Sequence, residues 1–327
     1  MAADGDADGT APAEGWLDAK ERGGVLAIRF TVFLTTLFGR AAARFIARFV
    51  AYYYTLSSPK ARAAIRTFHR HLSGRDLSFM EVHRHLRRFV LCTVDAFFLV
   101  SGKTKRFSVT RTGKEHLERL RDEKEGAILL GAHLGSFYAM RFSSAEEKHP
   151  LYALMYTANA RMLNDALAKL DPAGAARVLS LDPDGGMQSM LRVRDLLEEE
   201  SALIAIMGDR IPANTSDDRI VWVPFLGAPA PFPAGPFLLA SLLKCPVYLT
   251  LGIYRDPDTY DLYCEPFADR IVLPRGDRKG ALERYVAQYA ARLEEFARKH
   301  PDNWFNFYDF WAAPTTPAET PAAPASS

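Results

Sequence analysis

Short apolar runs alternate with amphipathic stretches along the chain from Lys114 onward. The apolar runs have the length of buried strands, and the stretches between them repeat hydrophobic residues every three to four positions, as helices do. The runs lie at 127–133, 151–156, 176–181, 202–209, 246–254 and 260–267, and the amphipathic stretches at 113–126, 159–170, 186–200, 235–245 and 279–300. This alternation predicts an α/β fold with a largely parallel central sheet and helices on both faces.

The segment 24–54 is also apolar, but its pattern is different. Its first half carries Arg29 and runs only to Phe38, which is short of the roughly 20 clean apolar residues of a spanning helix. Its second half places Arg40, Arg44 and Arg48 four residues apart on one helical stripe, beside aromatic positions. Such a helix is expected to lie in a membrane interface, with the arginines on lipid phosphates. A helix that packs on its own domain would have the same pattern.

Two further helices are expected over 59–72 and 78–100, and their histidines stand among arginines. These histidines form two pairs of the His-x-His type, His69 with His71 and His83 with His85. Residues two apart on a helix point in different directions, so neither pair has the geometry of a metal site. We therefore expect these histidines to lie on solvated polar faces.

The composition indicates where the folded region begins and ends, and it excludes some classes of function. The segment 1–14 consists mostly of small and acidic residues, and the segment 312–327 is rich in proline and small residues, so both are predicted to be disordered. Between them we expect a membrane-associating helical region over 15–113 and an α/β domain over 114–311. The net charge is only +2, but basic residues dominate the first third. This suggests a nearby anionic surface, either lipid headgroups or nucleic acid, and solvated helix faces are the alternative. The three cysteines lack a paired spacing and no glycine-rich phosphate loop occurs, so we expect no metal site, no disulfide framework and no nucleotide chemistry.

One histidine stands where a strand should end. The run 127–133 finishes at His133, and Gly135 and Ser136 precede the next expected helix. Backbone N–H groups at a helix start favour negative charge, so Gly135 and Ser136 are candidate donors to an oxyanion. A neutral imidazole suits a general base, although a structural histidine with satisfied hydrogen bonds is the alternative. Ser136 is better interpreted as a helix N-cap than as a nucleophile.

A second strand end, in the stretch IMGDR, carries Asp209 and Arg210. If this strand neighbours the first, both residues lie at the same edge of the sheet as His133. The aspartate could then orient the imidazole or a substrate hydroxyl, and the arginine could bind a phosphate in bidentate fashion. A structural ion pair or a helix cap would use the same residues.

Repeated prolines mark the segment VPFLGAPAPFPAGPFLLA, residues 223–240. They predict an extended and rigid loop that leads into a helix near Gly235. A stiff apolar loop beside a histidine could form one wall of a slot for an acyl chain, and an ordinary rigid connection would look the same.

These three stretches, in this order, resemble the bacterial lipid A biosynthesis acyltransferases, which are related to the glycerolipid acyltransferases. The family's His-x-x-x-x-Asp/Glu box matches at His133, its GD(Q/R) turn at 208–210 and its proline segment at 223–240. The opening GWLDAKERGGVLAIRF and the terminal NWFNFYDFW are similar to a subgroup, and the similarity covers about 15–311. One position departs from the box, because Tyr138 stands in place of the carboxylate. A phenol cannot stabilise an imidazolium by charge at neutral pH, and Asp209 is the candidate substitute.

The resemblance implies the transfer of a fatty acyl group from acyl-ACP or acyl-CoA, a co-substrate rather than a bound cofactor, to a hydroxyl of a membrane lipid or glycolipid. It implies His133 as the base, assisted by Asp209 and Tyr138, with Arg210 and Arg141 as substrate-binding residues. The acyl slot would be lined from the proline segment by Pro224, Phe225, Gly227, Pro229 and Gly235.

The implied partners are the carrier thioester, the lipid acceptor and a membrane surface, with no nucleic acid. The implied location is the cytoplasmic face of a bacterial inner membrane, reached as a peripheral or monotopic protein or through a single N-terminal anchor. The tyrosine at position 138 motivates a second hypothesis, a catalytically impaired relative that binds acyl chains, lipid or carrier protein without transfer.

Overall fold

The computed structural model describes residues 25–102, 106–146, 149–155, 168, 171, 177–180, 186–212 and 215–312. For residues 25–39, 142–146, 180, 186, 187 and 189 it describes the backbone alone. The expected disordered ends, apart from residue 312, and nearly all of the expected helix over 159–170 lie outside these ranges.

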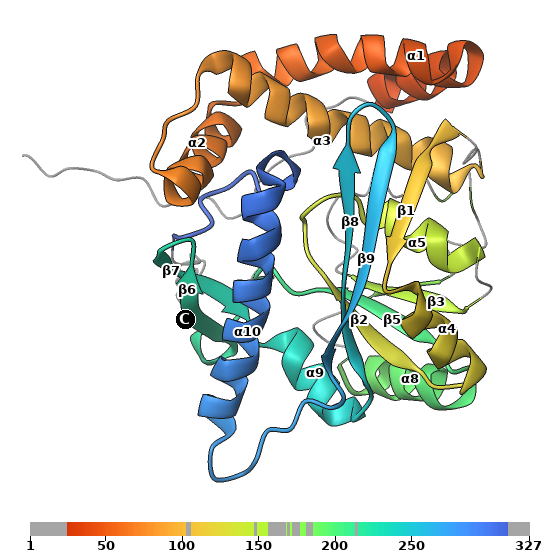
Figure 1. Ribbon diagram of the computed structural model, residues 1–327, viewed down its shortest axis with the longest axis vertical. Coiled ribbons are helices and arrows are strands. Elements are labelled where there is room, and N and C mark those ends of the chain that lie inside the picture. The colour runs from red at the N-terminus through yellow and green to blue at the C-terminus, as the bar shows by residue number, and fades with distance from the viewer. Residues whose placement is uncertain are drawn as a thin grey trace, which may run out of the picture.

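The elements follow the alternation expected from the sequence (Figure 1). The helices are α1 (Val25–Ser57), α2 (Pro59–Ser73), α3 (Phe79–Val100), α4 (Lys114–Asp122), α5 (Phe137–Glu146), α8 (Gly186–Glu199), α9 (Gly235–Leu243), α10 (Arg278–Lys299) and the 3-10 turns η3 (Asp217–Arg219) and η4 (Pro301–Asn303). The strands are β1 (Ser108–Thr112), β2 (Ala127–Gly131), β3 (Leu151–Met155), β4 (Val178–Ser180), β5 (Leu203–Met207), β6 (Ile220–Phe225), β7 (Ala228–Pro233), β8 (Val247–Arg255) and β9 (Thr259–Ala268).

Seven of these strands form one sheet in the order β1-β9-β8-β2-β5-β3-β4. Strands β8, β2, β5, β3 and β4 all run in the same direction, whereas β9 is antiparallel to β8 and β1 is parallel to β9. The expected α/β fold with a largely parallel sheet is confirmed. The register pairs Gly131 of β2 with Met207 of β5, so these two neighbouring strands end side by side.

Helices cover both faces of the sheet, and the alternating side chains of β2 show the division. Ile128 and Leu130 belong to a core shared with α8, α9 and α10. Ala127 and Leu129 point to the opposite face, where they pack with α4 and with Phe137 at the start of α5. Because both faces are buried, the strand is apolar throughout, as a strand of a covered parallel sheet should be.

The proline segment differs from its predicted form, because its first part is a β-hairpin rather than an extended loop. Strands β6 and β7 pair antiparallel through a two-residue turn at Leu226 and Gly227, both with positive φ (51° and 83°). In such a hairpin alternate pairs exchange no backbone hydrogen bonds. The prolines all occupy those alternate pairs: Pro224 with Pro229, Trp222 with Pro231 and Ile220 with Pro233. A missing N–H group therefore costs the hairpin nothing, which is why prolines are compatible with strands here.

Helices α1 and α3 lie side by side across the end of the sheet where β8 finishes (Figure 1). Helix α1 buries small residues, Ala43, Ala47 and Ala51, in the apolar cluster that it shares with α3. Its opposite face carries large side chains that are about three-fifths exposed, namely Phe45 (61%), Phe49 (61%), Tyr53 (59%) and Leu56 (61%). Among the described residues, no helix combines the length and the apolar character needed to cross a bilayer.

The helix histidines are not on solvated faces, and that prediction was wrong for three of the four. His69, His83 and His85 are buried with exposures of 6%, 7% and 0%, whereas His71 stacks on the ring of Trp311. The two members of each pair do diverge. Their divergence turns His69 and His85 inward, toward each other across the α2–α3 interface, with 3.4 Å between His69 Nε2 and His85 Nδ1.

Candidate active site

The ends of strands β2 and β5 bring His133 and Asp209 together. Each residue stands two positions beyond the last residue of its strand, and those last residues are register partners. The His133 Nδ1 lies 2.9 Å from Asp209 Oδ1, and the backbone N–H of His133 donates to Asp209 Oδ2, also at 2.9 Å. Because Asp209 contacts both the backbone and the ring of His133, it fixes the position and the rotation of the imidazole.

The charge of the Asp209 carboxylate determines which nitrogen of the His133 ring carries the proton. Asp209 is fully buried, and burial alone would raise its pKa. The His133 ring, the Arg210 charge and the Asn306 amide outweigh that effect and lower the pKa of Asp209 to about 2. An ionised carboxylate only accepts hydrogen bonds, so Nδ1 of His133 is the protonated nitrogen and Nε2 keeps a lone pair. The His133 side chain remains 30% exposed.

The pKa of His133 is shifted in the direction that a base requires. Burial and the charge of Arg210 lower the pKa of His133 below its usual 6.5, while the Asp209 carboxylate opposes that shift. The ring is therefore neutral at neutral pH. Its Nε2 can accept a proton there, and Asp209 is placed to stabilise the imidazolium that results.

A third residue of the site, Asn306, was missed by the sequence analysis. Its Nδ2 donates to Asp209 Oδ2 at 2.9 Å, and its Oδ1 accepts from Arg210 Nε at 2.7 Å. The backbone beside it is also fixed, because the N–H of Phe305 donates to the carbonyl of His133 at 2.8 Å. The stretch NWFNFYDFW has no strand or helix period, and only its similarity to a family subgroup drew attention to it. Its two asparagines, Asn303 and Asn306, are the only amide side chains in this aromatic stretch, and that was the available signal.

The C-terminal segment 303–306 thus works as a strap across the site. Leu134 forms an antiparallel bridge with Trp304, and the N–H of Gly135 donates to the carbonyl of Asn303 at 2.8 Å. The Asn303 side chain in turn accepts from the Tyr254 N–H and donates to the Tyr254 carbonyl. The strap therefore ties the loop after β2 to strand β8.

The expected oxyanion donors at Gly135 and Ser136 are committed to the backbone, which corrects that prediction. The Gly135 N–H bonds to Asn303 as described, and the Ser136 N–H donates to the carbonyl of Gly252 at 2.6 Å. Gly135 has a φ of +85°, and a Cβ there would lie 2.1 Å from Gly252 O. Glycine is required at this position for close packing of the loop on β8. The Ser136 hydroxyl accepts from the Ala139 N–H at 3.3 Å, so its expected role as the N-cap of α5 is confirmed.

Tyr138 does not stand in for the missing carboxylate. It packs against the apolar cluster of α1, α3 and the β8–β9 ends, and burial raises its pKa above the ordinary 10. Among the described residues, no hydrogen bond connects it to His133. The carboxylate that contacts the ring comes instead from β5, as Asp209.

The two arginines expected to bind substrate both have protein partners. Arg210 is half-buried and, besides its bond to Asn306, donates to the carbonyl of Phe305 at 3.0 Å. Arg141 on α5 forms an ion pair of 3.1 Å with Asp171. Arg210 is therefore a brace of the strap and a nearby positive charge for His133, and substrate binding by either arginine stays a prediction.

The residues expected to line an acyl slot do not share one environment. Phe225 is fully buried among Trp304, Phe232 and Phe310 in the main core. The other four, Pro224, Gly227, Pro229 and Gly235, are all exposed, and a Cβ at either glycine would meet open space. The hairpin meets the strap through Phe225 and Trp304, and its role toward an acyl chain remains a prediction.

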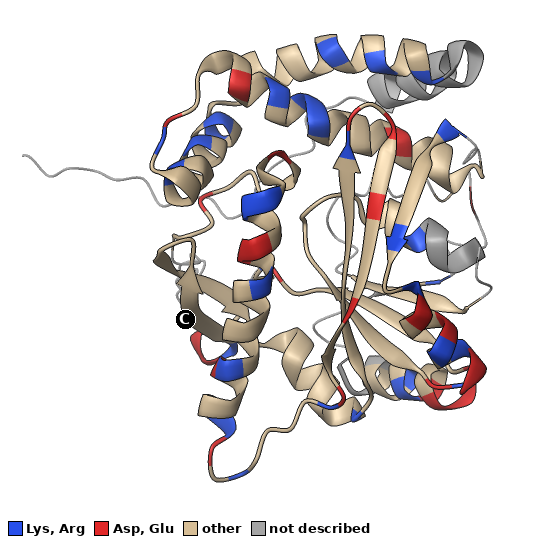
Figure 2. Cartoon of the chain, in the orientation of Figure 1, with Lys and Arg blue, Asp and Glu red and all other residues tan. Residues whose placement is uncertain are grey.

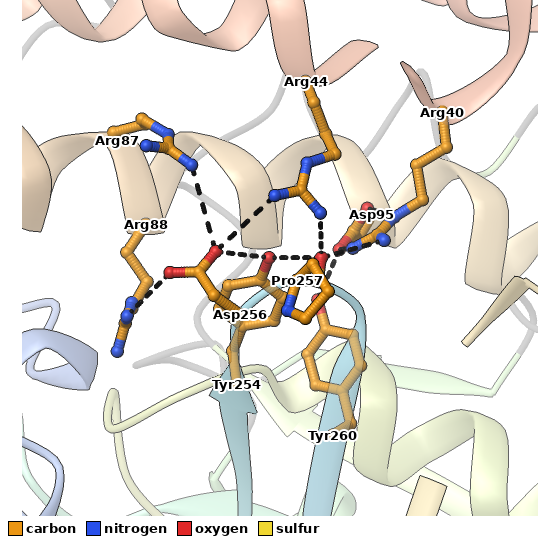
Figure 3. A network of polar contacts seen from close by, with 9 residues as sticks. All are labelled: Arg40, Arg44, Arg87, Arg88, Asp95, Tyr254, Asp256, Pro257 and Tyr260. Carbon is orange, nitrogen blue, oxygen red and sulfur yellow. Dashed lines mark hydrogen bonds and ion pairs between the residues drawn. The ribbon is translucent and has the colours of Figure 1, made fainter. Parts of the chain in front are cut away.

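The arginines of α1 were expected to contact lipid phosphates, and for Arg40 and Arg44 this is wrong (Figure 3). Arg40 is buried and bonds Asp95 of α3 through two nitrogens, at 2.9 and 2.7 Å. Arg44 donates to the carbonyl of Pro257, in the turn between β8 and β9. Both side chains therefore hold α1 on the domain. Arg48 alone of the three is exposed.

The fold and the site together define a class, that of α/β proteins with a histidine–carboxylate pair at the carboxyl edge of a parallel sheet, an arrangement suited to removing a proton from a hydroxyl. The sequence model of the bacterial lipid A biosynthesis acyltransferases matches residues 84–312, which is more than half of the chain. The chain belongs to this acyltransferase family, as its motifs suggested. A search of curated proteins found no match.

Proposed function

We propose that the protein transfers a fatty acyl group from a carrier thioester, acyl-ACP or acyl-CoA, to a hydroxyl of a membrane lipid or glycolipid. The observation that carries the proposal is the His133–Asp209 pair, in which Nδ1 bonds a buried carboxylate at 2.9 Å while the histidine side chain is 30% exposed. Membership of an acyltransferase family supports the reaction class.

In the proposed reaction, Nε2 of His133 takes the proton from the acceptor hydroxyl as its oxygen attacks the thioester carbonyl carbon. The tetrahedral intermediate collapses with cleavage of the carbon–sulfur bond, and the imidazolium returns the proton to the leaving thiolate. The products are an ester and a free thiol, with no acyl-enzyme. Asp209 stabilises the imidazolium formed between the two steps, as the buried aspartate of a serine protease triad does.

The alternative is a family member that binds acyl chains or carrier protein without transfer. It rests on Tyr138, which cannot replace a carboxylate. Because Asp209 contacts the ring directly, the site has a charged partner for an imidazolium, and the active enzyme is the better supported hypothesis.

Thiol release from acyl-CoA or acyl-ACP, measured with and without added membrane lipids, tests the proposal. We expect acceptor-dependent release that His133→Gln abolishes. His116→Gln is the matched control, because His116 is a half-buried histidine of α4 whose ring lies against Tyr248. Release that persists in the His133 variant would defeat the proposal, and saturable acyl-CoA binding without release would establish the alternative.

We also propose that α1 rests on the membrane surface, at the cytoplasmic face of an inner membrane, through its exposed aromatic face. Helix α1 buries alanines and exposes Phe45, Phe49 and Tyr53, the reverse of what packing on the domain alone favours. Basic residues outnumber acidic ones over residues 40–57 of α1 and on α2 and α3 (Figure 2), and Arg48 of α1 is exposed. Rings at the acyl boundary and cations near phosphates are the pattern of an interfacial helix.

A further inference from the structure

Two buried histidines and a carboxylate meet away from the candidate active site. His69 comes from α2, His85 from α3 and Asp302 from the turn η4. One ligand atom of each residue lies within 4.8 Å of the other two. The histidine rings are 6% and 0% exposed, whereas the Asp302 side chain is 30% exposed. The carboxylate therefore faces the side from which an ion could enter.

The hydrogen bond on the far side of His85 fixes where its lone pair points. Its Nε2 lies 2.6 Å from the carbonyl oxygen of Trp304. A carbonyl only accepts, so Nε2 carries the proton and Nδ1 keeps the lone pair. That Nδ1 faces His69, and Asp302 is the third member of the cluster. A histidine that donates one N–H to a backbone carbonyl and presents the other nitrogen to a metal is the usual arrangement of a metal ligand.

The distance between the two imidazole nitrogens also suits a shared ion. His69 Nε2 and His85 Nδ1 are 3.4 Å apart, whereas protein N–H hydrogen bonds are typically about 2.7–3.2 Å. Two nitrogens bound to one tetrahedral zinc at about 2.0–2.1 Å lie about 3.3 Å from each other. The rings meet at 80°, so they do not stack, and a common point can lie in both ring planes.

The carboxylate is available as the third ligand. It forms an ion pair with Arg88, whose NH1 lies 3.8 Å from Oδ2 of Asp302, longer than the roughly 2.7–2.9 Å of a charge-assisted hydrogen bond. Arg88 itself bonds Asp256 at 2.9 Å, so it has a closer anion. Two imidazoles and a carboxylate favour zinc or a neighbouring transition metal over Mg²⁺ or Ca²⁺, which prefer oxygen ligands throughout.

We propose that His69, His85 and Asp302 bind one divalent transition-metal ion, zinc first among them, with water as the fourth ligand. The ion is structural rather than catalytic. It joins α2 and α3 to η4, and η4 leads directly into the strap that contacts His133 and Asp209. The His-x-His pairs gave no sign of this site, because its two histidines come from different helices.

Zinc titration of the full-length protein tests the proposal without any measure of acyl transfer. After treatment with a chelator, the protein should bind one equivalent of Zn²⁺ with a rise in melting temperature, and Co²⁺ should give the visible spectrum of a tetrahedral site. His69→Gln and Asp302→Asn should each weaken Zn²⁺ binding at this site by at least about 100-fold, since even outer-shell partners contribute 10–100-fold. His71→Gln, on the same helix as His69 but outside the cluster, should bind as the unmodified protein does.

Asp302→Asn changes a partly exposed side chain without changing its size, so this variant is expected to fold even if the substitution of the buried His69 disturbs folding. Absence of saturable Zn²⁺ binding would overturn the proposal, as would binding that His69→Gln and Asp302→Asn leave unchanged. In either case the two histidines share a direct hydrogen bond, with His69 Nε2–H as the donor.

Discussion

Asp209→Asn is the substitution that most directly tests how the candidate site works. Three donors converge on this carboxylate: the backbone N–H and the ring Nδ1 of His133, and the amide of Asn306. An asparagine offers one oxygen and one NH₂ group. With its oxygen at the position of Oδ2, where two donors point, its NH₂ group faces the ring. Nδ1 must then accept, so Nε2 carries the proton and the base is lost.

The expected loss can be estimated from the same substitution in a serine protease triad, where the wrong tautomer costs about 10⁴-fold in turnover. That factor corresponds to about 5.5 kcal/mol of transition-state stabilisation. We expect a loss of this order in thiol release, with little change in KM, because the carboxylate is buried behind the ring and is not exposed to substrate.

Thiol release under saturating donor and acceptor, with circular dichroism to show that the variant folds, measures this effect. Tyr138→Phe is the control, since it removes only the phenolic oxygen of a residue next to the site in sequence, and it should retain activity within a few-fold. A folded Asp209→Asn variant within tenfold of the parent would refute the assignment of the charged partner.

Three further outcomes are expected. Tyr138→Glu should lower the melting temperature without raising turnover, because it places a carboxylate in the apolar cluster beside α1 and α3 at a cost of about 2 kcal/mol or more; a gain in turnover would show that the tyrosine had impaired the site. Arg210→Gln should move the acid limb of the kcat/KM profile to higher pH, since loss of the guanidinium raises the lowered pKa of the base toward 6.5, and an unmoved limb would argue against that electrostatic role. The pair Phe45→Ser and Phe49→Ser should weaken binding to anionic vesicles by about 2 kcal/mol, roughly 30-fold, whereas Leu242→Ser, an equally exposed residue of α9, should not.

The pairing of His133 with Asp209 could be expected from sequence, because each follows an apolar run and parallel strands end at a common edge. Asn306 could not, since the segment that carries it has no secondary-structure period and closes on the site through contacts remote in sequence. The part of the site that the strap contributes therefore depends on tertiary packing and cannot be predicted from a local pattern.

Other features were mispredicted because charge and proline were interpreted locally. Arg40 looked suited to lipid phosphate, but its partner Asp95 lies 55 positions away on α3. The prolines of β6 and β7 indicated a loop, although their register leaves them where no N–H is needed. His69 and His85 looked solvated because the packing of α2 on α3 is not visible in either helix alone.

The strap also sets the order in which the candidate site can assemble. A chain still being synthesised can pair strands β2 and β5 early, but Asn306, which bonds the Asp209 carboxylate, follows Asp209 by 97 positions. The hydrogen bonds around the histidine–aspartate pair are therefore complete only after residue 306 has been synthesised and packed, so a chain cut before the strap is expected to lack the organised pair.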